Sequence, residues 1–300
     1  MPLASSNGIE IYYETFGDPA DVPLLLVMGL TAQCTAWDEN FCTLLAGKGH
    51  YVIRFDNRDC GYSTKFDGVP VDAQAALMSR FGGPMPEVPY KLDAFSDDAF
   101  GLLDHLGLVA AHIAGASMGG MIVQTMAIAH PERVLSMTSI MSSTGELEYF
   151  ESAPEAIARM LAPPPADRDE YITSSAATAL VFSPHRHKDD AAARRYAGQH
   201  YDRMFYPEGG QRQFAAVEAS GHRADGLRSL RVPTLVIHGR ADQLILLKGG
   251  ERTAELIPGA TLVVFNDMGH DLPWQLWPQM TDAITTHVVQ ATKQRAVLSP

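Results

Sequence analysis

The clearest candidate for chemistry is a glycine-flanked serine in the first half of the chain. Gly115-Ala116-Ser117-Met118-Gly119 has the spacing G-x-S-x-G, follows a short apolar run and opens a helical pattern. Small residues two positions before and after the serine let a strand and a helix approach closely, so the hydroxyl stands exposed on a sharp, strained turn. The pattern alone also fits a glycine-rich turn with a solvated serine. The strand–turn–helix context favours a nucleophile at Ser117.

A serine hydroxyl is a weak nucleophile unless a neighbouring base takes its proton. Eleven histidines are available in the chain. His270 is favoured because it opens a loop directly after a predicted strand at residues 261–265. His238 ends another predicted strand and is interpreted as structural. The remaining histidines lie on predicted helices, at strand starts or in a segment without strands.

An imidazole base needs a carboxylate that fixes its tautomer and stabilises its cation. Asp242 is the best candidate, since it lies in the loop that follows the predicted strand 234–238, one strand before His270. Two rivals are weaker. Asp267 lies only three residues before His270, too close in sequence to reach around the ring easily. Glu146 is the first acid after the predicted strand 135–141.

Backbone N–H groups are expected to hold the negative oxygen that develops during attack on a carbonyl. One is that of Met118, directly after the serine, and the other that of Leu30, in the loop after the predicted strand 23–28. Gly29, Trp37 and Trp274 lie close in sequence to the oxyanion loop or the base. We therefore expect them to line the substrate pocket.

The elements that must position these groups alternate between strand and helix patterns. Short apolar runs without strict alternation are typical of strands buried on both faces, as in a parallel sheet. The predicted strands are 9–15, 23–28, 51–55, 111–115, 135–141, 234–238 and 261–265, and the predicted helices are 41–48, 95–106, 118–129, 250–257 and 273–290. The pattern predicts an α/β fold with a mostly parallel central sheet flanked by helices.

One segment interrupts this alternation. Residues from about 145 to 225 contain helix-like pieces, three consecutive prolines and clustered charges, without a convincing strand. We interpret residues 145–225 as a helical cap inserted into a core domain formed by residues 1–144 and 226–300. Such an insertion lies over the carboxyl ends of the strands, where ligands bind in open α/β sheets.

Composition excludes several other classes of function. The 23 basic and 35 acidic residues leave a formal net charge of −12, which argues against nucleic acid and anionic membranes as partners. Three cysteines without a C-x-x-C pair argue against a disulfide framework or a zinc site. No signal peptide or long apolar run is evident. The sequence therefore predicts a cytoplasmic protein without metal or cofactor.

With these features the chain resembles the α/β-hydrolase superfamily, in particular its small serine esterases related to the aclacinomycin methylesterases. The resemblance covers nearly the whole chain. It is carried by Val27-Met28-Gly29, by Asp56-Asn57-Arg58 with Gly61 and Ser63, by the Ser117 motif, by PTLVIHG at 233–239 with Asp242, and by IPGA at 257–260 leading to MGHDLP at 268–273. Met28 departs from the family, where histidine is usual. The run that begins at Asp56 is interpreted as a turn whose side chains tie down neighbouring loops.

The resemblance implies a serine carboxylic-ester hydrolase in which Ser117 attacks, His270 transfers the proton and Asp242 orients the imidazole. The expected partner is a small to medium uncharged ester, and the oligomeric state is left open, with a homo-oligomer as one alternative. Related members include lactonases, C–C bond hydrolases and cofactor-free perhydrolases with the same three residues. A ligand sensor with little turnover is the alternative outside enzymes. The sequence does not identify the physiological substrate.

Overall fold

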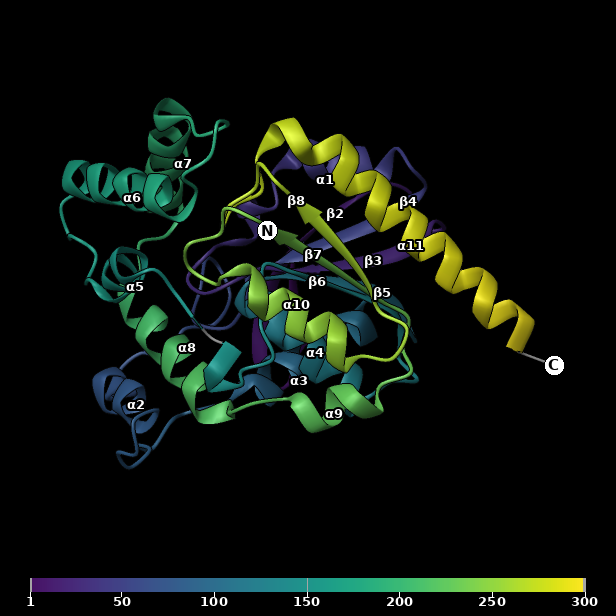
Figure 1. Ribbon diagram of the computed structural model, residues 1–300, viewed down its shortest axis with the longest axis horizontal. Coiled ribbons are helices and arrows are strands. Elements are labelled where there is room, and N and C mark those ends of the chain that lie inside the picture. Colours follow the sequence, from purple (N-terminus) through teal and green to yellow (C-terminus); the bar gives the residue numbers. More distant parts are fainter. Residues whose placement is uncertain (1, 150, 299–300) are drawn as a thin grey trace.

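The computed structural model describes residues 2–149 and 151–298, and these contain an eight-stranded sheet (Figure 1). Its strand order is β1-β2-β4-β3-β5-β6-β7-β8. The neighbouring strands from β3 to β8 all pair in parallel, whereas β2 pairs antiparallel with both β1 and β4. The bounds are Leu3–Ser6 (β1), Ile9–Phe16 (β2), Val22–Val27 (β3), His50–Phe55 (β4), Ala111–Ala116 (β5), Val134–Ile140 (β6), Thr234–Gly239 (β7) and Thr261–Phe265 (β8). The predicted α/β class with a mostly parallel sheet is confirmed.

Helices cover both faces of this sheet. α1 and α11 pack on one face, and α3, α4 and α10 on the other (Figure 1). These helices span Glu39–Ala46 (α1), Leu92–His105 (α3), Met118–Ala129 (α4), Leu247–Leu256 (α10) and Trp277–Leu298 (α11), while α2 spans Ala73–Ser79 and packs against α8. Among the described helices, none is both long enough and apolar enough to cross a membrane.

The burial of β3 explains why its sequence is a continuous apolar run. Leu24 and Leu26 belong to the apolar cluster on the α1/α11 side, and Leu25 and Val27 belong to the cluster on the α3/α4 side. Successive side chains of a strand point to opposite faces, so a strand with helices on both sides needs apolar residues at every position. The central strands are therefore packed by helices on both faces, and this packing fixes the position of their carboxyl ends.

A helical region is inserted between β6 and β7. It contains α5 (Pro154–Leu161), α6 (Arg168–Phe182), α7 (Asp190–Arg203), α8 (Pro207–Ser220) and α9 (Ala224–Ser229). Figure 1 shows α5 to α8 beyond the end of the sheet toward which the parallel strands run. The last helix, α9, extends past the boundary at 225 that the sequence predicts. The division of the chain into a core domain and a cap stays a prediction.

The two segments that flank α5 to α8 lie side by side. The backbone N–H of Arg223 donates to the carbonyl of Thr144 at 2.8 Å. A Cβ atom on Gly145 would lie 2.6 Å from the carbonyl oxygen of Gly221, so only a glycine fits between the two segments there. Gly145 also has a φ of +83°, which glycine adopts without steric cost. The chain thus leaves the core and returns to it at one place.

Two differences from the predicted elements have simple causes. β1 is absent from the prediction because its four residues, Leu-Ala-Ser-Ser, are short and only half apolar. The last helix begins at Trp277 and not at Pro273, since a short 3₁₀ helix, Trp274–Leu276, precedes it. Helix boundaries of this kind are not encoded by apolar periodicity alone.

Candidate active site

The candidate nucleophile lies on a strained turn between β5 and α4. Ser117 has φ 57° and ψ −120°, a backbone conformation that is unfavourable for a residue with a side chain. Glycines on both sides make the turn sterically allowed. A Cβ atom on Gly115 would lie 2.1 Å from the Gly119 carbonyl oxygen, and one on Gly119 would lie 2.1 Å from that of Val27. The G-x-S-x-G spacing thus has the structural role that the sequence predicts.

The structure brings Ser117, His270 and Asp242 together in a chain of hydrogen bonds. His270 Nε2 lies 2.9 Å from Ser117 Oγ, and His270 Nδ1 lies 2.8 Å from Asp242 Oδ2. A carboxylate only accepts hydrogen bonds, so Nδ1 carries the hydrogen and Nε2 is free to accept one from the hydroxyl. This tautomer is the one that a general base for Ser117 requires.

Asp242 is held as a carboxylate in a buried position. Its Oδ1 accepts from the backbone N–H groups of Leu244 and Ile245, both at 2.9 Å. Burial alone raises the pKa of Asp242, but the charge of His270 and the hydrogen bonds from His238 and His270 outweigh it and lower the pKa to about 2. The acid is therefore ionised at neutral pH.

His238 is a second histidine next to the same acid. The ring is fully buried, and its Nε2 donates to the Ile245 carbonyl at 2.8 Å while lying 3.4 Å from Asp242 Oδ2. A Cβ atom on Gly250 would lie 2.4 Å from its Nδ1, so the glycine makes room for the ring. The sequence predicts a structural role for His238; its contact with Asp242 has no signal in the sequence except the spacing of four residues.

Both expected N–H donors belong to residues that line the same cavity as Ser117. Met118 begins α4, so its N–H has no acceptor within the helix, and the Leu30 N–H has no protein acceptor among the described residues. Gly29 packs closely against the serine, since a Cβ on it would lie 3.0 Å from Ser117 Cβ. Residues 29–33, which we call the β3 loop, thus begin against Ser117.

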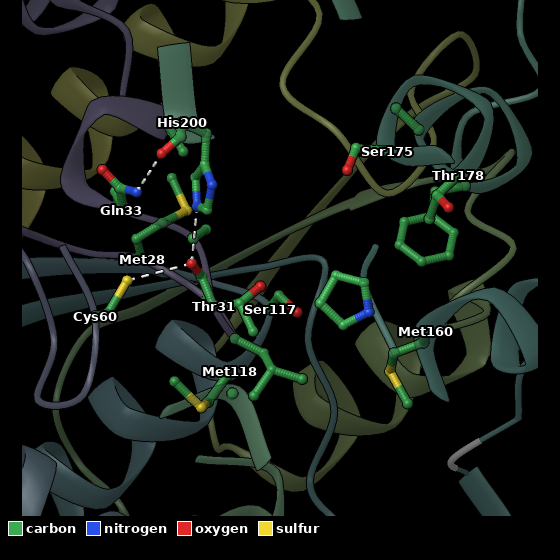
Figure 2. A pocket seen from close by; sticks show the side chains of 18 of the residues that line it. Met28, Thr31, Gln33, Cys60, Ser117, Met118, Met160, Ser175, Thr178 and His200 are labelled. Atoms are coloured by element: carbon green, nitrogen blue, oxygen red, sulfur yellow. Dashed lines mark hydrogen bonds between the residues drawn. The ribbon is translucent and has the colours of Figure 1, made fainter. Parts of the chain in front are cut away.

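A cavity of about 2220 Å³ opens above Ser117 between the core and the inserted helices. Its lining includes Gly29, Leu30, Met118 and Trp274, and Trp274 stands at its rim with 61% of its surface exposed. Figure 2 shows Ser117 and Met118 near Thr31 of the β3 loop, with Ser175 and Thr178 of α6 across the cavity.

The prediction that Trp37 lines the pocket is wrong. Its side chain is fully buried and stacks on Phe41 with ring centroids 5.6 Å apart, away from the residues that line the cavity. Proximity in sequence to the β3 loop does not determine the direction of a side chain. Trp37 begins a turn toward α1, and its ring enters the core on the α1/α11 face.

The rival acids are engaged elsewhere. Glu146 accepts from Arg252 at 3.0 Å, and Asp267 pairs with Arg186 at 2.8 Å. In the described part of the chain, neither carboxylate forms a hydrogen bond or ion pair with His270. The residues that the structure describes contain no group of three histidine, cysteine or acidic side chains arranged to hold a metal ion.

The run that begins at Asp56 ties down neighbouring loops, as predicted. Asp56 accepts from the backbone N–H groups of Cys34 and Tyr62, at 2.7 and 2.8 Å. Asn57 donates to the carbonyl of Met28 at 2.8 Å. This turn also forms ion pairs with the inserted helices, Asp56 with Arg203 at 2.7 Å and Asp59 with Arg212 at 2.8 Å. No pattern in the sequence indicates these two pairs.

The inserted helices also reach the loop of His270. The backbone N–H of His270 donates to the carbonyl of Phe182 at 3.1 Å, and His185 Nε2 lies 2.9 Å from Asp271 Oδ2. These partners are more than 80 residues apart in sequence, and no motif links them. Contacts of this kind become visible only in the folded chain.

Comparison with known proteins gives matches over most of the chain. A family model described as alpha/beta hydrolase fold matches residues 22–275. The rhodomycin D methylesterase of Streptomyces sp. (strain C5) is 27% identical over 97% of this chain and 98% of its own length. The 2-hydroxymuconate semialdehyde hydrolase of Pseudomonas sp. (strain CF600) is 30% identical over 88% of this chain and 83% of its own.

Solved structures show the same fold. A meta-cleavage product hydrolase from Pseudomonas fluorescens IP01 superposes with a TM-score of 0.77 at 21% identity, covering 97% of this chain and 98% of that one. The enol-lactonase from Burkholderia xenovorans LB400 has a TM-score of 0.71 at 21% identity, covering 97% of this chain and 100% of that one.

Proposed function

The chain belongs to the alpha/beta hydrolase fold family, and from this premise we propose that it is a serine-dependent hydrolase of carboxylic esters. The observation that carries the proposal is the chain of hydrogen bonds from Ser117 through His270 to Asp242, at 2.9 and 2.8 Å. Its geometry supports a nucleophile, a general base and an orienting acid in one line.

The first half of the reaction transfers the acyl group to the serine. Ser117 Oγ attacks the ester carbonyl carbon while His270 Nε2 takes the hydroxyl proton, and the Asp242 carboxylate stabilises the imidazolium. The N–H groups of Leu30 and Met118 donate to the resulting oxyanion. When the tetrahedral intermediate collapses, the carbon–oxygen bond to the alcohol breaks, and the leaving alkoxide takes the proton back from His270.

The second half releases the acid. A water molecule gives a proton to His270 Nε2 and attacks the acyl carbon, forming a second tetrahedral intermediate at the same two N–H groups. Its collapse breaks the bond to Ser117 Oγ, which regains a proton from His270. The products are one alcohol and one carboxylic acid, and no cofactor takes part in any step.

For the substrate, we propose a small-alkyl ester of a large, mainly apolar acid. The cavity of about 2220 Å³ exceeds the roughly 300–1,000 Å³ of ordinary ligand pockets. This volume favours a larger molecule than the small to medium ester that the sequence predicts. Apolar side chains such as Met118, Met121 and Leu244 line it together with Ser117. The two similar rhodomycin D methylesterases support an ester with a small alcohol. The net charge of −12 favours an uncharged substrate over an anionic one.

A second candidate, hydrolysis of a C–C bond or a lactone, is favoured by relatives with those activities in their names. The same three residues serve both reaction classes. Purified protein tested against methyl esters of graded acid size, lactones and vinylogous diketones separates them. We expect turnover of the methyl esters with equal amounts of methanol and acid. Turnover confined to the lactones or diketones would contradict the ester proposal.

A further inference from the structure

The residue after Leu30 has a strained backbone. Thr31 has φ 60°, in the left-handed region that a β-branched residue rarely adopts. A conformation of this kind persists only when the surrounding structure holds it. The φ angle of Thr31 orients the peptide that joins it to Leu30. Holding that peptide in place restricts Leu30, whose own N–H lies in the adjoining Gly29–Leu30 peptide and is the expected donor.

Side chains from distant parts of the chain satisfy both backbone polar groups of Thr31. Its N–H donates to Gln213 Oε1 at 2.8 Å. Its carbonyl oxygen accepts from His200 Nε2 at 3.1 Å and from the thiol of Cys60 at 3.2 Å. Gln213 lies on α8 and His200 on α7, so two of these three groups belong to the inserted region. Figure 2 shows the bonds of His200 and Cys60 to Thr31.

The amide of Gln213 has only one usable orientation. The side chain is fully buried, and its Nε2 donates to the carbonyl of Arg58 at 2.7 Å. Since the Thr31 N–H only donates and the Arg58 carbonyl only accepts, the two ends of the amide cannot be exchanged. Gln213 therefore bridges the β3 loop to the turn after β4, and an apolar residue in its place would leave two backbone groups unsatisfied.

His200 is equally constrained. The Thr31 carbonyl only accepts, so His200 Nε2 carries a hydrogen, and the hydroxyl of Tyr171 donates to Nδ1 at 3.0 Å. Burial lowers the pKa of His200, which favours this neutral form. Gln33 fixes the backbone of the same helix, because its Nε2 donates to the His200 carbonyl at 2.8 Å and to that of Met204 at 2.9 Å.

We propose that Gln213 and His200 are positioning residues for the reaction: from the inserted helices they hold Thr31 in its left-handed conformation and so aim the Leu30 N–H at the oxyanion. The inference rests on the proposed ester hydrolysis. A donor held in place before the reaction needs no reorganisation when charge develops, and this makes such groups effective. The inserted region then contributes to catalysis as well as to substrate binding.

The test compares Gln213→Leu and His200→Phe with the wild type and with Asp202→Asn. Asp202 lies on α7, two residues from His200, and its side chain pairs at the surface with Arg168. For each protein, kcat and KM for one methyl ester and the inhibition constant of a trifluoromethyl ketone are measured, with the melting temperature as a check of folding. The ketone forms a hemiketal with Ser117 whose oxyanion needs the same donors.

We expect kcat to fall about 10- to 100-fold in Gln213→Leu and severalfold in His200→Phe, below the ~10²–10³-fold loss known for complete removal of one donor. KM stays unchanged, the ketone binds more weakly in proportion, and Asp202→Asn behaves as the wild type. His200→Gln, which keeps a donor for the Thr31 carbonyl, restores most of the activity.

If the wild type is active, and folded Gln213→Leu and His200→Phe keep its kcat and its affinity for the ketone, this inference is overturned. The proposed function is then unaffected. The same holds if only KM rises, because that result assigns these residues to substrate binding. If Gln213→Leu does not fold, the contrast between His200→Phe and His200→Gln decides. A wild type that neither hydrolyses the ester nor binds the ketone would overturn the proposed function and this inference together.

Discussion

The ring of His238 lies against Asp242, with its Nε2 3.4 Å from the same carboxylate oxygen that His270 Nδ1 approaches to 2.8 Å. The acid therefore has two imidazole neighbours, of which only one faces the serine. The other is fully buried and also donates to the carbonyl of Ile245. Its contact fixes the carboxylate and helps to lower the pKa of Asp242.

We expect His238→Leu to lower kcat/KM about tenfold, the scale of one hydrogen bond to a charged group. His238→Gln keeps an N–H donor and should lose less. Steady-state kinetics on one ester, with thermal unfolding in parallel, measures both variants. Equal activity of folded His238→Leu and the wild type would show that the contact has no effect on the reaction.

Ser117→Ala should fold normally and lose at least ~10³-fold in turnover, because the nucleophile is gone while the donors and the cavity remain. A fluorophosphonate should label the wild type at Ser117 and leave the variant unlabelled. Peptide mapping after labelling identifies the serine. A label on any other serine would place the nucleophile elsewhere.

Asp242→Asn should lower kcat/KM on the order of 10⁴-fold, since the amide keeps the shape but lacks the charge that holds the imidazole tautomer. Asp267→Asn and Glu146→Gln are the matched controls, because their carboxylates pair with Arg186 and Arg252. They should stay within tenfold of the wild type. If one of them collapses while Asp242→Asn remains active, the acid is assigned to the wrong residue.

The two tryptophans should separate stability from substrate binding. Trp274 is exposed at the cavity rim, so Trp274→Ala should raise KM for large esters severalfold and leave the hydrolysis of an acetate ester unchanged. Trp37 is buried and its Nε1 has no partner among the described residues, so Trp37→Phe loses only packing. It should cost about 1–3 kcal/mol in unfolding free energy without a change in KM. The opposite pattern would reverse the two assignments.

Three buried histidines, two on the sheet beneath α11 and one on α11 itself, predict a loss of stability in acid. Burial lowers the pKa values of His50, His112 and His287, and for His112, where positive charge on the other two and on Arg295 adds to burial, the pKa falls from 6.5 to about 3. The unfolded chain therefore binds more protons than the folded one below pH 6.5. Stability present above that pH is lost as the pH falls toward 3.

At pH 5, which is 1.5 pH units below 6.5, His112 alone lowers the free energy of unfolding by about 2 kcal/mol, at roughly 1.4 kcal/mol for each pH unit. Denaturant unfolding between pH 8 and 4 measures it. His112→Gln, which can still bond to Ser136, should flatten this dependence, whereas the surface change His130→Gln should not. An unchanged slope in His112→Gln would refute the assignment.

The parts of the site that the sequence predicts are those set by local rules. Ser117 is found because its turn requires glycines at fixed spacing, and Asp242 and His270 are found because parallel strands bring their carboxyl ends to one edge. The fold follows from apolar runs such as β3, which are buried on both faces.

The parts that escape prediction depend on side-chain direction or on distant contacts. Trp37 has the expected place in the sequence, but its ring points into the core. Gln213 is 182 residues from Thr31, and nothing in the composition of α8 marks it. Such residues are recognised only when the three-dimensional structure places a buried amide between two backbone groups.

The side-by-side segments at Gly145 and Gly221, which flank α5 to α8, have an evolutionary consequence. A gene can exchange everything between these two points without altering the path of the sheet, and in this way acquire a new substrate range. The exchange has one condition if Thr31 depends on α7 and α8 as we infer. The incoming segment must bring its own donor and acceptor for that residue, so recombination at this junction is constrained by chemistry as well as by chain geometry.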